Sequence, residues 1–81
     1  MYEKAIIYSK PNCPYCIQAE GLLSDNNIEY TKLVLDEHYT REDLLEKVPN
    51  ARSVPQIFLY NNSEEVYVGG YDKLSKLLKD G

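Results

Sequence analysis

The residues Cys13-Pro14-Tyr15-Cys16 read CPYC, and they contain both cysteines of this 81-residue chain. The motif lies between a short apolar run that predicts a buried strand, Lys4 to Ser9, and an amphipathic stretch that predicts a helix, Pro14 to Asp25. A thiol at a helix start faces unsatisfied N–H groups and the positive end of the helix dipole, and both favour its ionised form. The pattern therefore indicates a redox pair in which Cys13 is the reactive thiol, because Cys16 falls one turn inside the helix.

Two structural uses of the cysteine pair are weaker alternatives. A disulfide that closes a ring of about four residues would contribute only ~2 kcal/mol of stability, against ~3 kcal/mol for a loop of about fifteen residues. A zinc site would need two further ligands, whereas the chain has one histidine, His38, and no second CxxC. His38 is interpreted as a solvent-facing loop residue without a functional role. We therefore favour redox chemistry and expect no metal site.

Composition predicts one globular domain over residues 1–81, because 43% of the residues are hydrophobic and 27% are charged. The first ten residues hold only a four-residue apolar run, Ala5 to Tyr8, which is too short for a signal sequence or a membrane span. A cytoplasmic monomer is expected, and a reducing compartment suits a reversible thiol pair. The net charge of −4, with nine basic residues dispersed among thirteen acidic ones, argues against nucleic acid as a partner.

The rest of the chain alternates between strand and helix patterns. A strand is expected from Ile28 to Leu35, followed by a helix that begins at the capping box of Thr40 and Asp43, runs through Val48 and is ended by Pro49. Two further strands, Gln56 to Tyr60 and Glu65 to Val68, flank a turn from Asn61 to Ser63. The last element is a helix that Asp72 caps and Gly81 closes. The first two strands, joined by a helix, should pair in parallel, and the last two should form an antiparallel hairpin. The order βαβαββα predicts an α/β fold with a four-stranded mixed sheet and three helices.

Three landmarks in this order identify a family. They are Lys10 to Cys16 (KPNCPYC), Ser53 to Phe58 (SVPQIF) and Gly69 to Asp72 (GGYD). Over nearly its whole length the chain resembles the dithiol glutaredoxins, especially the small bacterial and phage-type members, although Ser53 replaces the usual threonine. The resemblance implies the thioredoxin fold, with Cys13 as nucleophile and Cys16 as resolving thiol. It also implies that glutathione is the reductant.

The resemblance also assigns one half of a glutathione site. Pro55 matches a cis proline that faces the active cysteine and leaves the backbone of Val54 free to pair with glutathione as a short added strand. Gly70, Tyr71 and Asp72 form the turn into the last helix, whose free N–H groups suit the γ-glutamyl carboxylate. The carboxylate of Asp72 is expected to accept hydrogen bonds from the glutathione ammonium.

Three further side chains complete the expected site. Lys10 matches the family lysine that favours the thiolate and meets the glycine carboxylate. Arg41 lies near the place where the family often has a second carboxylate holder. Tyr15 is expected to pack beside the bound peptide, with a plain surface aromatic as the alternative.

The chain is therefore expected to be a glutathione-dependent thiol-disulfide oxidoreductase that reduces protein disulfides and protein–glutathione mixed disulfides, with no bound cofactor and glutathione as cosubstrate. Ribonucleotide reductase is an expected recipient by family analogy only. One alternative is a glutaredoxin-like redoxin that depends on thioredoxin reductase, but such proteins lack the GGYD turn. Another is an iron–sulfur binding module bridging two chains through Cys13 and glutathione, which proline after the first cysteine disfavours in the family.

Overall fold

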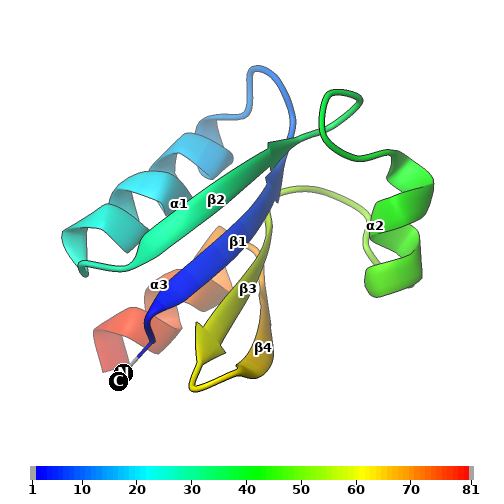
Figure 1. Cartoon of the computed structure of the whole chain (residues 1–81). Coiled ribbons are helices and arrows are strands. Elements are labelled where there is room, and N and C mark those ends of the chain that lie inside the picture. Colours follow the sequence, from blue (N-terminus) through cyan, green and yellow to red (C-terminus); the bar gives the residue numbers. More distant parts are fainter. Residues whose placement is uncertain (1, 81) are drawn as a thin grey trace.

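The structure, a computed structural model, describes residues 2–80 and contains four strands and three helices (Figure 1). In chain order the elements are β1 (Lys4–Ser9), α1 (Pro14–Asp25), β2 (Glu29–Val34), α2 (Arg41–Lys47), β3 (Gln56–Asn61), β4 (Glu64–Gly69) and α3 (Tyr71–Asp80). The sheet order is β2-β1-β3-β4, with β1 parallel to β2, β3 antiparallel to β1, and β3 and β4 paired as a hairpin. The predicted mixed sheet and βαβαββα order are confirmed. None of the described helices is long and apolar enough to cross a membrane.

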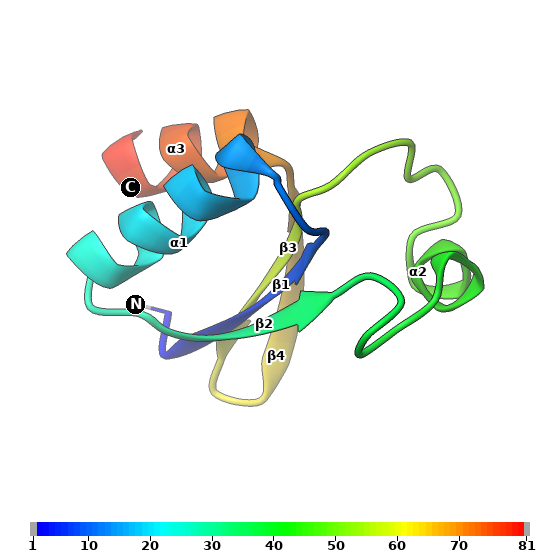
Figure 2. The same cartoon turned by 90° about the horizontal axis from the view of Figure 1, so that it is seen from above.

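The main core lies between the sheet and two of the helices. Figure 2 shows α1 and α3 side by side over one face of the sheet, with α2 apart from them. Apolar side chains that alternate along β1 and β3 meet leucines of α1 and α3, and the largest of them are completely buried: Ile7, Leu23, Ile57, Leu59 and Leu74. This core fixes the start of α1, and with it Cys13, against the carboxyl end of β1.

The helix α2 rests on a smaller core on the other face of the sheet. Leu44 packs there with Val48, Tyr39 and Phe58. The helix begins at the predicted capping box, in which the Thr40 N–H donates to Asp43 Oδ2 over 2.9 Å and the Asp43 N–H donates to Thr40 Oγ1 over 3.2 Å. It ends at Lys47, one residue earlier than predicted, because Val48 precedes a proline and leaves the helical conformation, with φ −130° and ψ 85°.

The cap of α3 differs from the prediction. Asp72 is not the N-cap, since the helix begins at Tyr71 and the Leu74 N–H donates to the Gly70 carbonyl over 3.1 Å. The reason is that β4 continues through Gly69, whose φ of 111° turns the chain so sharply that only Gly70 separates strand from helix. Asp72 therefore lies in the first turn, with its carboxylate beside the positive end of the helix dipole. The predicted closing residue, Gly81, lies outside the described residues.

The hairpin turn is also shorter than predicted. Asn61 belongs to β3 and Glu64 to β4, which leaves Asn62 and Ser63 as the two turn residues. Both have positive φ, 51° and 73°, as a type I′ turn requires. The strand β2 is shorter by one residue at each end than the predicted Ile28 to Leu35.

Candidate active site

The two cysteines lie at the start of α1, where the sequence predicts them. Cys13 is the N-cap and Pro14 is the first helical residue, so its missing N–H leaves no hydrogen bond unmade. Cys13 and Cys16 are joined by a disulfide with a Cα–Cα distance of 5.3 Å. The Cys16 N–H donates to Cys13 Sγ over 3.2 Å. When the pair is reduced, the same N–H and the helix dipole favour a thiolate at Cys13.

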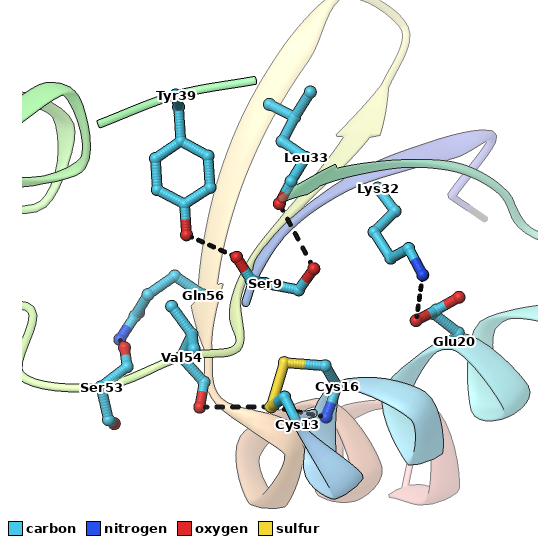
Figure 3. The surroundings of a disulfide bond; sticks show 10 residues. All are labelled: Ser9, Cys13, Cys16, Glu20, Lys32, Leu33, Tyr39, Ser53, Val54 and Gln56. Atoms are coloured by element: carbon cyan, nitrogen blue, oxygen red, sulfur yellow. Dashed lines mark hydrogen bonds and ion pairs between the residues drawn. A yellow bond between two sulfur atoms is a disulfide. The ribbon is translucent and has the colours of Figure 1, made fainter. Parts of the chain in front are cut away.

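The segment before β3 faces the disulfide. Figure 3 shows the Val54 carbonyl pointing at Cys13, and the distance from Cys13 Sγ to Val54 O is 4.0 Å. The Val54–Pro55 peptide bond is cis, as the resemblance implies. Cys16 is buried beneath this contact with 2% of its surface exposed, against 5% for Cys13. Cys13 is therefore the more exposed sulfur of the pair, and the Val54 backbone lies against it.

A hollow of about 290 Å³ lies on one side of Val54, and we name it the Asp72 pocket. It brings together six of the predicted site residues: Tyr15, Val54, Pro55, Gly70, Tyr71 and Asp72. The rings of Tyr15 and Tyr71 are 6.3 Å apart and form its aromatic wall, with Tyr15 60% exposed and free to cover a ligand. Ser53 and Lys73 also line this pocket, although the sequence analysis did not include them in the site.

A second hollow of about 230 Å³ lies on the other side of Val54, and we name it the Lys10 pocket. Lys10 and Arg41, 31 positions apart in the sequence, both line it. Arg52 is a third cationic lining residue that the sequence analysis missed, although its place directly before the SVPQIF landmark was a usable signal. Ser53 and Val54 line both pockets, so the two hollows meet at the residue that faces the disulfide.

The two pockets differ in charge. Among the described lining residues, the Lys10 pocket contains three cations, whereas the Asp72 pocket contains one carboxylate and the ammonium of Lys73. A ligand that carries a carboxylate at one end and an ammonium at the other would therefore find an opposite charge for each end in the two pockets that meet at Val54. Apolar walls from Leu35, Leu44 and Leu45 lower the local dielectric on the Lys10 side.

His38 lies outside both pockets. It is exposed in the loop after β2, and its Nδ1 accepts a hydrogen bond of 3.0 Å from the Val34 N–H. The expected loop position is confirmed, and the hydrogen bond gives the side chain a local structural part in closing the turn. Within residues 2–80, no three His, Cys, Asp or Glu side chains gather in a group that could hold a metal ion.

Comparison with known proteins gives matches of sequence and of fold. The Glutaredoxin family model matches residues 5–63. Glutaredoxin 1 of Rickettsia felis is 38% identical over 79 residues, which cover 94% of this chain and 72% of that protein. The structure of reduced Escherichia coli glutaredoxin is similar with a TM-score of 0.74 and 29% identity, covering 96% of this chain and 95% of that one. A buckwheat glutaredoxin solved in complex with glutathione has the same fold, with a TM-score of 0.75 and 23% identity over 95% of this chain and 69% of its own.

These matches, together with a disulfide-forming pair at the start of α1 in a thioredoxin-like fold, establish the class of the protein. The chain belongs to the glutaredoxin family of thiol oxidoreductases.

Proposed function

We propose that this chain is a glutathione-dependent oxidoreductase that reduces protein disulfides and protein–glutathione mixed disulfides. The observation that carries the proposal is that the Asp72 pocket and the Lys10 pocket meet at Val54, whose carbonyl oxygen lies 4.0 Å from Cys13 Sγ. Glutathione is a tripeptide with an ammonium and a carboxylate at its γ-glutamyl end, a carboxylate at its glycine end, and a thiol between them. Its charge pattern fits the two pockets in only one direction.

In this direction the γ-glutamyl end occupies the Asp72 pocket. Asp72 accepts hydrogen bonds from the ammonium, and the free N–H groups of the first turn of α3 bind the carboxylate. Tyr15 packs against the peptide and Val54 pairs with its backbone. Support comes from the buckwheat glutaredoxin of the same fold, which was solved with glutathione bound.

The glycine carboxylate then lies in the Lys10 pocket. Lys10 and Arg41 hold it there, and Arg52 adds a third positive charge. Lys10 serves a second purpose, because a cation three residues before Cys13 favours the thiolate. Only 5% of Cys13 is exposed, which limits access of water to its sulfur.

The reaction on a mixed disulfide requires one thiol. The Cys13 thiolate attacks the glutathione sulfur, the disulfide breaks, and the protein leaves as a thiolate that takes a proton from solvent. The resulting Cys13–glutathione disulfide is attacked by a second glutathione thiolate, which forms glutathione disulfide and releases the Cys13 thiolate. In the net reaction, the mixed disulfide and one glutathione are converted into the free protein thiol and glutathione disulfide. The two electrons that reduce the mixed disulfide come from glutathione.

The reaction on a protein disulfide requires both thiols. Cys13 forms a mixed disulfide with the protein, and the Cys16 thiolate attacks Cys13 Sγ to release the reduced protein and close the Cys13–Cys16 disulfide. Two glutathione molecules then restore the dithiol and leave as glutathione disulfide. The partners we propose are glutathione and disulfide-containing or glutathionylated proteins, met by a monomer in a reducing cytoplasm.

The choice of electron source tests the proposal. A glutathionylated peptide is offered as substrate, and NADPH consumption is followed with glutathione plus glutathione reductase in one arm and thioredoxin reductase alone in the other. We expect turnover in the first arm only. Turnover that requires thioredoxin reductase and ignores glutathione would replace the proposal with the redoxin alternative.

A further inference from the structure

Tyr39 is a buried polar side chain for which the proposed reaction has no use. Its hydroxyl donates a hydrogen bond of 2.8 Å to the backbone carbonyl of Ser9, and Figure 3 shows the ring reaching down to that carbonyl. Only 6% of Tyr39 and 1% of Ser9 is exposed. A buried hydroxyl that makes one directed bond over 30 sequence positions holds two segments together.

Both segments contribute residues to the lining of the Lys10 pocket. Ser9 is the last residue of β1 and directly precedes Lys10, while Tyr39 comes two residues before Arg41, the first residue of α2. Tyr39 itself also lines this pocket. The hydrogen bond therefore ties the backbone next to one cation to the backbone next to the other.

The backbone makes a first link between these segments, because the Leu35 N–H donates to the Ser9 carbonyl and Leu35 pairs with Tyr39. The tyrosine hydroxyl adds the side-chain bond to this link. The helix α2 lies apart from α1 and α3 (Figure 2), and its one buried residue is Leu44. The ring of Tyr39 packs edge-on against Tyr8, with centroids 5.0 Å apart. The hydroxyl adds the directed contact that an aromatic ring alone does not supply.

The Tyr39 hydroxyl stays protonated at neutral pH, and its removal leaves no buried group without a hydrogen-bond partner. Burial, with smaller contributions from Tyr8 and Asp36, raises the pKa of Tyr39 above its ordinary value, so the proton stays on the oxygen at neutral pH. The Ser9 carbonyl also accepts the Leu35 N–H over 2.9 Å. Loss of the tyrosine hydroxyl therefore leaves no buried acceptor without a partner.

We propose that Tyr39 is a positioning residue whose hydroxyl sets the separation of Lys10 and Arg41, and thereby the affinity of the Lys10 pocket for the glycine carboxylate of glutathione. The inference rests on the proposed function. It assigns to Tyr39 no contact with the reacting sulfur atoms.

The test compares two thiols that differ in one charge. Glutathione and its glycine ethyl ester share the γ-glutamyl end and the thiol, but the ester lacks the glycine carboxylate. In the parent protein we expect kcat/KM for glutathione to exceed that for the ester about tenfold, equivalent to about 1.4 kcal/mol. In Tyr39→Phe the preference should fall to about twofold or threefold, because a shift of either cation weakens its charge-assisted bond.

Tyr8→Phe is the matched control. It removes a hydroxyl from the neighbouring ring, for which no hydrogen bond is found among the described residues, and it should keep the tenfold preference. A general loss of stability would slow both thiols equally and leave the preference unchanged, so the ratio separates positioning from folding.

Each other outcome overturns the inference in a distinct way. A Tyr39→Phe protein that is folded by circular dichroism and keeps the parent's preference would show that the hydroxyl does not position the cations for binding. A parent protein that uses glutathione but does not prefer it to the ester would overturn the inference and leave the proposed function standing. A parent protein that does not use glutathione at all would end both.

Discussion

Replacing Asp72 by asparagine tests whether the carboxylate charge of the Asp72 pocket binds glutathione, because the substitution exchanges one side-chain oxygen for an NH₂ group. The change keeps the size and shape of the side chain and removes its charge. Since Asp72 is the second residue of α3 and not its N-cap, the helix keeps its Gly70 cap and loses only the attraction between a carboxylate and the helix dipole, about 0.3–1 kcal/mol. The variant should therefore fold.

The expected effect on binding follows from the exposure of the site. A charge-assisted hydrogen bond contributes about 1.5–3 kcal/mol, and Asp72 is exposed, so solvent screening reduces this to about 1 kcal/mol. The Michaelis constant for glutathione should then rise about fivefold, and kcat should change little because the ammonium lies far from the reacting sulfur.

The assay varies glutathione at a fixed concentration of glutathionylated peptide. Glu29→Gln, at the opposite end of the sheet, removes one negative charge elsewhere and should leave the Michaelis constant unchanged. A folded Asp72→Asn protein with the parent's glutathione dependence would refute the assignment of Asp72 and favour the thioredoxin-reductase-dependent alternative.

Three further changes have defined outcomes. Cys16→Ser should abolish reduction of protein disulfides but leave mixed-disulfide reduction intact, and equal loss of both in a folded protein would contradict the two-route mechanism. Ser63→Gly should raise the free energy of unfolding in urea by about 1 kcal/mol, because a φ of 73° is strained for serine. An unchanged or lower free energy of unfolding would show that this strain does not destabilise the turn. Burial, and then the 2.6 Å hydrogen bond to Glu65, raises the pKa of Tyr60 from 10.0 to about 12. The protonated Tyr60 hydroxyl therefore contributes fully to stability below pH 10, and this contribution is lost as the pH rises toward 12 and above. Tyr60→Phe should flatten the fall in stability across this window, and an equally steep fall would argue against the assignment.

Local chemistry made much of the fold predictable. The capping box of α2 and the proline at the start of α1 act within a few residues, so the sequence carries them directly. The α3 cap was mispredicted because two residues, Gly70 and Asp72, could serve on either side of Tyr71, and the choice depends on the backbone turn at Gly69. That turn is set by pairing between β4 and β3, which a local pattern does not contain.

The site was predictable where a motif marks it and not where tertiary packing makes it. Cys13 and Asp72 lie in landmarks of fixed sequence. Arg52 and Lys73 are single basic residues directly beside those landmarks, which is the one signal the sequence gives for them, and the folded chain shows which pocket each of them lines. The bond from Tyr39 to Ser9 depends on the parallel placement of β2 beside β1 and on the loop that follows, and neither residue type hints at it.

The uneven charge of the molecule governs how substrates arrive. Four of the nine basic side chains line the two pockets with a single carboxylate, although the chain as a whole carries a charge of −4. The net negative charge repels an anionic disulfide, whereas the cations around the two pockets attract it within about one Debye length, roughly 8 Å at physiological salt. This attraction orients an anionic substrate toward Cys13 before contact and raises its association rate. Added salt therefore lowers the association rate of anionic substrates more than that of neutral ones.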